Sequence, residues 1–498
     1  MVGFETVSTH VLQILGKLRM ASILFQVIIS LLALCLAYSV FTRKKAPAPL
    51  PPGPPQKPII GNLGDLPPPG VQDWQHWLKH KELYGPISSV TVFGQTLVIL
   101  NKARLAVELL EKRSAIHSSR LRTPFAYMSG WNHVLGTLAY SEDFRTTRKN
   151  LHRQIGSGAT VSRFDKIQEA EVGRFLLRLF HRPDELIHHI RKQAGALILR
   201  VGYGYTIEPH ERDPLVDLAD KAMGDFGVAV APGAWVVDYI PILRHLPSWF
   251  PGAGFKQIAE GFKKTVVTLS DQPYQWVKQR VAQNDFEPSL LSGLLETSNF
   301  VPGSEEERVT KWSAASLYAG GSDTTVSSIA TFFLAMTLYP EAQRKAQAEI
   351  DRVVGHDRLP GFKDRPNLSY NNALIKEILR WHPVSPIALP HLSMEDDMCD
   401  GYFIPKGSSV LPNIWAFTHD PDVYPDPMQF KPERFIESDS HIPEYDPYML
   451  AFGFGRRTCP GRVLADASVY LNVTQSLAVF NISKSIEDVA GMGNSFER

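Results

Sequence analysis

The stretch Phe452-Gly-Phe-Gly-Arg-Arg-Thr-Cys-Pro-Gly461 decides how this chain of 498 residues is interpreted. It has the form F-x-x-G-x-R-x-C-x-G, in which Gly455 and Gly461 let the backbone turn and approach a metal closely. A thiolate that ligates a metal also needs nearby N–H groups to stabilise its charge. Apolar residues recur at helical spacing after the cysteine, so we expect Cys459 at a helix start with Pro460 in the first turn, where the helix dipole favours a thiolate.

The composition limits the function classes. The 52 Lys and Arg residues nearly balance the 51 Asp and Glu residues, so no strong field attracts nucleic acid, and we expect no nucleic-acid partner. The three cysteines, Cys35, Cys399 and Cys459, are too few and too scattered for a disulfide framework or a zinc cluster. A reducing compartment fits this cysteine usage best.

The amino-terminal region has three predicted parts. After segment 1–20, residues 21–41 carry no charged side chain and could cross the roughly 30 Å hydrocarbon core as a transmembrane helix. A cleaved signal peptide is the alternative, but the basic cluster at 43–45 is typical of an anchor with a cytosolic carboxyl-terminal side. The basic, proline-rich segment 42–55 is expected to be a stiff hinge, or else a proline-rich ligand for another protein.

Residues 56–498 are expected to form one mainly α-helical domain with small β-sheets, because long helical patterns dominate and no clear linker interrupts them. The segment 87–100 is predicted to be a β-hairpin centred on Phe93-Gly94-Gln95. The apolar, proline-punctuated stretch 234–251 is expected either to contact lipid or to pack as an ordinary loop.

A second motif lies in the helical run 310–338, for which Thr310 is a possible cap. The sequence Gly-Gly-Ser-Asp-Thr-Thr at 320–325 interrupts this run, and each glycine inside a helix costs about 1 kcal/mol relative to alanine. One explanation is that the helix breaks there. The other is that the backbone approaches a cofactor closely, with Asp323 and Thr324 supplying protons beside it.

A third motif is Glu377-Ile-Leu-Arg380, whose two charged residues share one helix face and can pair. It is followed by Phe430-Lys-Pro-Glu-Arg-Phe435. Taken alone, the first of these segments describes an ordinary surface ion pair.

In this order, the three motifs resemble the cytochrome P450 family, and most of all its fungal microsomal members that modify secondary metabolites. The resemblance implies the cytochrome P450 fold after a membrane anchor, and heme b with Cys459 as the axial iron ligand rather than a structural cysteine. It also implies that Glu377, Arg380 and Arg434 form a buried structural network behind the heme.

The resemblance further implies the residues of the site. Cleaving dioxygen requires two protons at the distal oxygen, for which Thr324 would hold a hydrogen bond and Asp323 would relay protons. The heme propionates would be held by the two arginines and the histidine of the cofactor-binding set. Family members usually carry tryptophan at the position of Phe144, which cannot donate the indole hydrogen bond. The full cofactor-binding set is Cys459, Arg457, Arg148, His391, Phe452, Gly455, Gly461, Gly320 and Gly321.

Segments that match the family's pocket walls are mostly apolar. They are 122–131, 384–389 and the helix face with Leu317 and Ala319, so we expect a lipophilic substrate such as a terpenoid.

The implied activity is that of a monooxygenase (EC 1.14 type) that uses O2 and electrons from NADPH. No Gly-x-Gly-x-x-Gly fingerprint precedes a helix, so NADPH-cytochrome P450 reductase must supply the electrons. Lys149, Arg456 and Arg462 could dock that reductase, or could be ordinary solvated charges. The expected location is the endoplasmic reticulum membrane, single-pass, with a cytosolic catalytic domain.

Two alternatives stay open. One is an O2-independent heme-thiolate isomerase or dehydratase, against which Asp323 and Thr324 argue. The other is a shortened, weakly active or non-catalytic protein with the same fold. The sequence stops 39 residues after Cys459, so we expect it to lack the carboxyl-terminal strand hairpin that closes the substrate pocket in full-length relatives.

Overall fold

The computed structural model describes residues 46–68, 70–208, 211–231, 233–297 and 300–484, together with Gln26 and Ser30. The chain divides into two compact units, one of residues 1–49 and 401–403, the other of residues 50–400 and 404–498. In the first unit, the N–H of Phe403 donates to the carbonyl of Pro49 at 2.8 Å. Apart from Gln26 and Ser30, the expected segment 1–20 and anchor 21–41 lie outside the described residues. Within the described part, no helix is long and apolar enough to cross a membrane.

The second unit is mainly helical, as the sequence predicts. In chain order the helices are α2 (Asp73–Tyr84), α3 (Ala103–Ala106), α4 (Pro124–Met128), α5 (Glu142–Ile155), α6 (Gly158–Val161), α7 (Asp165–His181), α8 (Leu186–Tyr203), α9 (Pro214–Ala229), α10 (Val236–Tyr239), α11 (Phe255–Ala282), α12 (Leu290–Glu296), α13 (Glu305–Leu338), α14 (Pro340–Val354), α15 (Ser369–Trp381), α16 (Ile414–Thr418), α17 (Tyr448–Ala451) and α18 (Arg462–Val479). The strands of the chain are β1 (Ile87–Val92), β2 (Gln95–Leu100), β3 (His391–Leu392), β4 (Asp397–Cys399), β5 (Tyr402–Ile404), whose first two residues belong to the first unit, and β6 (Ser409–Pro412).

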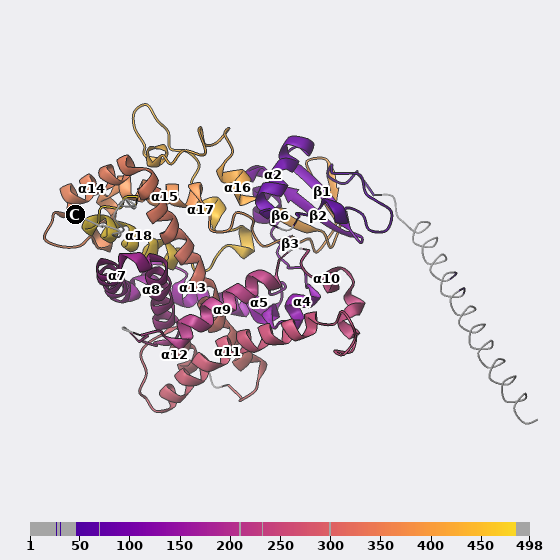
Figure 1. Ribbon diagram of the computed structural model, residues 1–498, viewed down its shortest axis with the longest axis horizontal. Coiled ribbons are helices and arrows are strands. Elements are labelled where there is room, and N and C mark those ends of the chain that lie inside the picture. The colour runs from indigo at the N-terminus through magenta and orange to yellow at the C-terminus, as the bar shows by residue number, and fades with distance from the viewer. Residues whose placement is uncertain are drawn as a thin grey trace, which may run out of the picture. The chain divides into compact units, whose positions relative to one another are not determined.

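The predicted hairpin is confirmed, and β1 and β2 pair in antiparallel register with Val92 opposite Gln95. Phe93 and Gly94 form the turn with φ of 49° and 83°, and two positive φ values give the tight turn that matches the twist of the strands. Strand β6 joins β2 in parallel and β3 in antiparallel pairing, so the order is β1-β2-β6-β3. In Figure 1 the orange β6 lies beside the indigo hairpin, which brings distant parts of the sequence together.

Helix α13 begins earlier than the sequence indicated. The side chain of Ser304 accepts a hydrogen bond from the N–H of Glu307 at 3.2 Å and caps the helix, so the first helical residue is Glu305. Thr310 is buried inside the helix and is not its cap. Ser304 is the preferred cap because three glutamates follow it in the first turn, where the helix dipole favours negative charge.

The buried apolar side chains form two large clusters, and α13 runs through both. Its residues from Trp312 to Ala319 belong to the first cluster, with side chains from α5, α8, α9 and α11. Its residues from Val326 to Met336 belong to the second, with side chains from α7, α14, α15 and α18. The Gly-Gly-Ser-Asp-Thr-Thr segment at 320–325 therefore lies between the two clusters.

Candidate functional site

The cysteine loop leads from α17 to α18 and is held by its own backbone. The N–H of Cys459 donates to the carbonyl of Phe452 at 2.8 Å, and that of Arg457 donates to the carbonyl of Phe454 at 3.0 Å. The helix after the loop begins at Arg462, with Gly461 at the cap. The expectation that Cys459 opens the helix with Pro460 in its first turn is therefore wrong, because the chain makes one further turn before the helix begins.

The glycines of the loop have different roles. Gly455 has φ of 53°, and a Cβ there would lie 2.3 Å from the carbonyl oxygen of Leu110, so only glycine fits. Gly453, which the sequence analysis did not single out, also has a positive φ of 76°. Gly461 has an ordinary φ of −87°, and the nearest atom to a Cβ there would be the Cys459 sulfur at 3.9 Å. Glycine at 461 thus keeps space free beside the sulfur.

The Cys459 thiol is accessible to solvent although protein surrounds it. Burial raises the pKa of this thiol, while the backbone N–H of Gly461 and the guanidiniums of Arg148 and Arg462 lower it. Among the described residues, these are the groups that would stabilise a thiolate at this position.

Helix α13 runs unbroken through the 320–325 segment, which excludes the predicted helix break. Gly320, Asp323 and Thr324 are exposed in the middle of this otherwise largely buried helix. A Cβ at Gly320 would meet no atom within 4 Å, so open space lies beside the backbone there. At Gly321 a Cβ would lie 2.3 Å from Ile198 Cδ1, so this glycine allows α8 to pack closely.

The two candidate proton donors lie on the open face of α13. The Thr324 hydroxyl donates to the carbonyl of Gly320 at 2.7 Å and keeps its lone pairs free to accept. Burial and the charge of Asp220 raise the pKa of the Asp323 carboxyl, and Arg191 lowers it. Helices α13 and α18 contact each other, which brings α13 and the helix that follows the cysteine loop together.

Arg457 is buried and extends over the ring of Phe144, with its Cζ 3.9 Å from the ring centroid. Its N–H groups donate to the carbonyls of Ser118 at 2.6 Å, Leu135 at 3.2 Å and Leu138 at 2.6 Å. Burial, helped by two neighbouring arginines, lowers the pKa of Arg457 to about 8. The charge on this guanidinium therefore lacks compensation.

The other two predicted cations lie in the same region. Arg148 donates to the carbonyl of Thr458 at 2.6 Å, and His391 on β3 has its Nδ1 2.7 Å from the carbonyl of His117. Burial lowers the pKa of His391, and so do the charges of nearby arginines. The structure thus brings Arg148, His391 and Arg457 together.

A fourth cation, Arg120, was missed in the sequence. It donates to the carbonyls of Gly136 at 3.0 Å, Leu389 at 2.7 Å and Pro390 at 2.8 Å, and burial lowers its pKa to about 10. Arg122 carries the same charge two residues later and is exposed, so no local signal distinguishes the two arginines. In the described part of the chain, no acidic side chain forms an ion pair with Arg120, Arg148 or Arg457.

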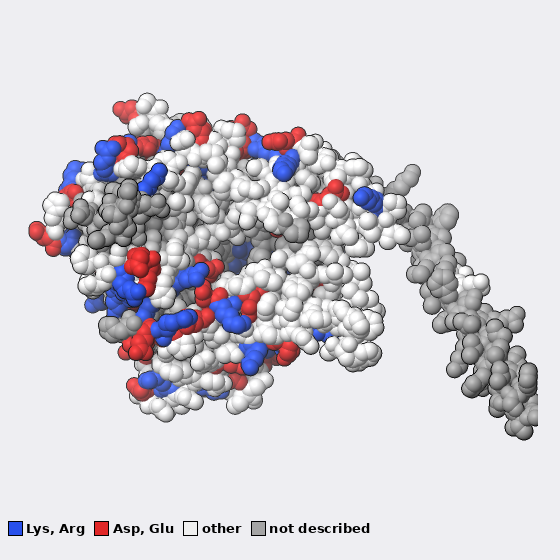
Figure 2. Space-filling model, in the orientation of Figure 1, with Lys and Arg blue, Asp and Glu red and all other residues white. Residues whose placement is uncertain are grey.

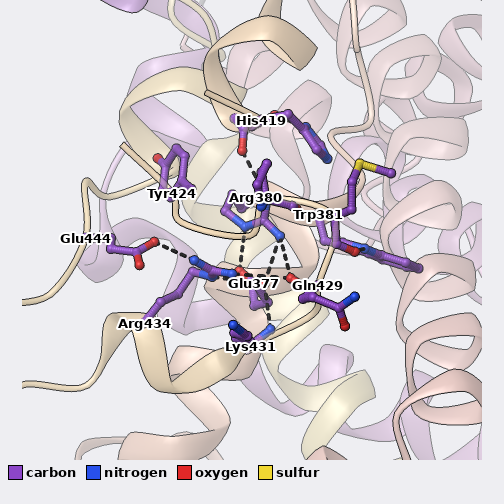
Figure 3. Close-up of polar contacts among 12 residues, drawn as sticks. Glu377, Arg380, Trp381, His419, Tyr424, Gln429, Lys431, Arg434 and Glu444 are labelled. Atoms are coloured by element: carbon purple, nitrogen blue, oxygen red, sulfur yellow. Dashed lines mark hydrogen bonds and ion pairs between the residues drawn. The ribbon is translucent and has the colours of Figure 1, made fainter. Parts of the chain in front are cut away.

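The predicted network of Glu377, Arg380 and Arg434 is confirmed and is completely buried (Figure 3). Arg380 donates to both Glu377 oxygens, at 2.7 and 2.8 Å, and Arg434 Nε donates to Glu377 Oε1 at 3.2 Å. The structure adds Glu444, which accepts from Arg434 at 2.7 Å, and the N–H of Lys431, which donates to Glu377 at 2.8 Å. The network connects α15 to the segment before the cysteine loop.

The apolar segments expected to line a pocket are only partly brought together. Phe125 and Trp131 share a buried cluster with Leu317 and Ala319, as expected. Ile387 instead packs against the cluster under the four-stranded sheet, so it does not belong to that wall.

Comparison with known proteins gives a decisive match. The family model described as Cytochrome P450 matches residues 51–489. The chain is a cytochrome P450.

Curated relatives of this cytochrome P450 include fungal monooxygenases. It is 51% identical to cytochrome P450 monooxygenase ppsD of Aspergillus oryzae over 94% of this chain and 89% of the relative. It is 47% identical to O-methylsterigmatocystin oxidoreductase of Aspergillus flavus over 91% of this chain and 86% of the relative. It is 46% identical to cytochrome P450 monooxygenase claR of Ampulloclitocybe clavipes over 97% of this chain and 88% of the relative. The protein is therefore an oxidoreductase of the cytochrome P450 monooxygenase type.

The cofactor of this family is heme with a cysteine thiolate as iron ligand, and the residues present fit it. Arg120, Arg148 and Arg457 have no acidic partner among the described residues, and heme would bring two carboxylates for these cations and for the buried His391. The absence of a side chain at Gly320 and at Gly461 leaves space beside the α13 backbone and beside the Cys459 sulfur.

Proposed function

We propose that this cytochrome P450 inserts one oxygen atom from O2 into a lipophilic secondary metabolite, with Cys459 as the axial heme ligand. The observation that carries the proposal is a group of three arginines, Arg120, Arg148 and Arg457, which lies with the buried His391 near an accessible thiol and has no acidic partner among the described residues. When bound, the heme supplies the activation of oxygen.

The residues of this chain have separate roles in the proposal. Arg120, Arg148, Arg457 and His391 hold the heme carboxylates. Asp323 relays protons through its carboxyl group, whose pKa burial raises, and the Thr324 hydroxyl accepts a hydrogen bond from water because its own hydrogen is donated to the carbonyl of Gly320.

The reduced carbon monoxide spectrum tests the ligand. The wild-type protein is expected to show a thiolate-type Soret band, and Cys459→Ser is expected to lose it while remaining folded by circular dichroism. Cys399→Ser is the matched control, since Cys399 is a buried free cysteine. A wild-type protein that is folded and binds heme without that band would contradict the proposal.

Turnover tests the reaction class. With NADPH and a cytochrome P450 reductase, we expect an oxidised product that contains one atom of labelled O2, and we expect no product when either O2 or NADPH is omitted. Suitable substrates are a panel of terpenoids and O-methylsterigmatocystin, because one relative carries that compound in its name. Product formation without O2 would favour an isomerase or dehydratase.

We also propose that the reductase docks near the cysteine loop, where Lys149, Arg456 and Arg462 are exposed. Arg456 is held in place, since it donates to the Tyr140 hydroxyl at 2.7 Å and lies over the Tyr140 ring. Charge reversal of Lys149 and Arg462 is expected to raise the reductase concentration needed for half-maximal turnover and to leave the thiolate-type band unchanged.

Location in the endoplasmic reticulum membrane, single-pass, with the catalytic domain in the cytosol, is part of the same proposal. Besides the uncharged run 21–41, it is supported by three exposed apolar side chains after α9: Val236 at 63%, Ile242 at 72% and Trp249 at 81% exposure. Figure 2 shows that the surface around α10 is almost free of charged side chains. A protein without residues 1–45 should still bind lipid vesicles. The same shortened protein with both Ile242→Asp and Trp249→Asp should not bind them.

A further inference from the structure

The loop that carries Cys459 is closed by a contact between its two ends. Tyr448 is the first residue of α17, before the loop, and Asp466 lies in the second turn of α18, after it. The hydroxyl of Tyr448 donates a hydrogen bond to Asp466 Oδ1. Both side chains are half-buried, so this hydrogen bond is partly shielded from competing water.

From Tyr448 the contact continues to the cysteine in two steps. The ring of Tyr448 stacks on the ring of Phe452, with centroids 5.5 Å apart and planes inclined by 19°. The carbonyl of Phe452 accepts the N–H of Cys459 at 2.8 Å. A displacement of Tyr448 would therefore be transmitted through Phe452 to the backbone of Cys459.

Asp466 is fixed from the other side by Arg365. The two terminal nitrogens of Arg365 donate to the two Asp466 oxygens at 2.8 Å each, which is the paired geometry that restricts orientation. Arg365 is anchored in turn to α15, because its Nε donates to Asn372 Oδ1 at 3.0 Å and Asn372 donates to the Arg365 carbonyl at 2.8 Å. Its guanidinium also lies 4.7 Å from the ring centroid of Tyr470. Asp466 thus holds the loop against the helix that carries Glu377.

We propose that Tyr448 and Asp466 are positioning residues that keep the Cys459 thiolate on the heme iron. The proposal rests on Cys459 being the ligand, as proposed above. Neither residue touches the cofactor in this account. They act by fixing the two ends of the loop, so the sulfur has less freedom to move away from the metal.

The test uses the heme-loaded protein and its reduced carbon monoxide complex. The variants are Tyr448→Phe, which removes only a hydroxyl, Asp466→Asn and the double variant. The matched control is Tyr205→Phe, which removes a comparable hydrogen bond, 3.0 Å long, to Asp213 between α8 and α9. The measurement is the rate at which the thiolate-type Soret band converts to the thiol-type band under mild warming, beside the rate of unfolding by circular dichroism.

We expect Tyr448→Phe to convert about fivefold to thirtyfold faster than the wild type, the range that corresponds to the loss of one hydrogen bond to a charged group. Asp466→Asn should also convert faster than the wild type, because the amide weakens the paired contact with Arg365 while its oxygen can still accept from the Tyr448 hydroxyl. The double variant should convert faster than either single variant, since the two changes weaken different contacts of residue 466. Tyr205→Phe should convert at the wild-type rate.

Several outcomes would overturn the proposal. Equal conversion rates in Tyr448→Phe and the wild type would show that the contact does not hold the ligand. Conversion and unfolding that accelerate in the same proportion would show a general loss of stability instead. If Asp466→Asn does not fold, Tyr448→Phe still decides. A wild-type protein without the thiolate-type band would contradict the proposed function itself, which is a different result.

Discussion

The guanidinium carbon of Arg457 lies 3.9 Å from the ring centroid of Phe144, and that of Arg148 lies 5.9 Å from the same centroid. Phe144 is buried at the start of α5, where Ser141 caps the helix through the Phe144 N–H at 3.3 Å. The ring therefore serves as an aromatic surface for two cations. Family members usually have tryptophan here, so phenylalanine keeps this contact and loses only the indole N–H.

Replacement of Phe144 tests this contact. Phe144→Leu should weaken heme retention by about 1–2 kcal/mol, because a buried cation loses its aromatic face. Phe144→Trp should retain heme at least as well as the wild type, since it keeps the face and adds a donor. Transfer of heme to an excess of an acceptor protein measures the difference. Equal heme loss from the wild type, Phe144→Leu and Phe144→Trp would show that the aromatic face does not contribute to heme retention.

Gly455 should tolerate no side chain. Gly455→Ala places a Cβ 2.3 Å from the Leu110 carbonyl at a positive φ, so we expect a loss of roughly 3 kcal/mol or more in the free energy of unfolding. Gly461→Ala is the control, because its Cβ meets only the Cys459 sulfur at 3.9 Å, and heme-free protein should unfold almost as the wild type does. Urea titration of the heme-free proteins measures both values. A stable Gly455→Ala protein would contradict the close approach to Leu110.

Glu377→Gln should be strongly destabilising. The change leaves Arg380 and Arg434 buried without their shared carboxylate, and such a loss costs about 3–5 kcal/mol. Glu341→Gln provides the comparison, since Glu341 pairs with Arg344 at the same i, i+3 spacing on the surface and should change stability by less than about 1 kcal/mol. Chemical denaturation of both variants checks the prediction. If Glu377→Gln and Glu341→Gln lose a similar amount of stability, then burial of the network does not make the loss of its carboxylate more costly.

Asp238 should make stability depend on pH. Its Oδ1 accepts the N–H of Phe125 at 2.7 Å, and burial raises the pKa of its carboxyl to about 6. Since this value exceeds the unfolded value of 3.8, the folded protein keeps a proton that the unfolded chain has lost between these two pH values. The contribution of Asp238 to stability is therefore fully present below pH 3.8 and declines as the pH rises to about 6.

Asp238→Asn should remove this decline, because the amide oxygen still accepts from Phe125 and does not titrate. The difference in unfolding midpoint between variant and wild type is expected to grow from pH 4 to pH 6 in favour of the variant. A difference that stays constant over this range would show that the carboxyl is not perturbed.

What the sequence predicted well was local or followed from the family. The hairpin turn at Phe93 and Gly94 depends on two adjacent residues, and the pairing of Glu377 with Arg380 depends on helix spacing. The grouping of Arg148, His391 and Arg457 came from the resemblance, because nothing in their spacing brings them together.

What the sequence did not predict depends on contacts between distant segments. Arg120 is as charged as Arg122, and only the fold decides which of them is buried. Asp466 resembles any acidic residue on a helix until the fold places Arg365 and Tyr448 beside it. The start of α13 was missed for a different reason, since Ser304 and Thr310 are both acceptable caps and the acidic first turn decided between them.

The adjacent glycines of α13 give this enzyme one adjustable position and one fixed position. Any side chain at 321 would enter Ile198, whereas a side chain at 320 would enter open space. Residue 320 can therefore be enlarged in steps, from alanine upward, without disturbing how α13 packs on α8. The same changes at 321 would require the Ile198 side chain to move and would disturb the packing of α13 on α8.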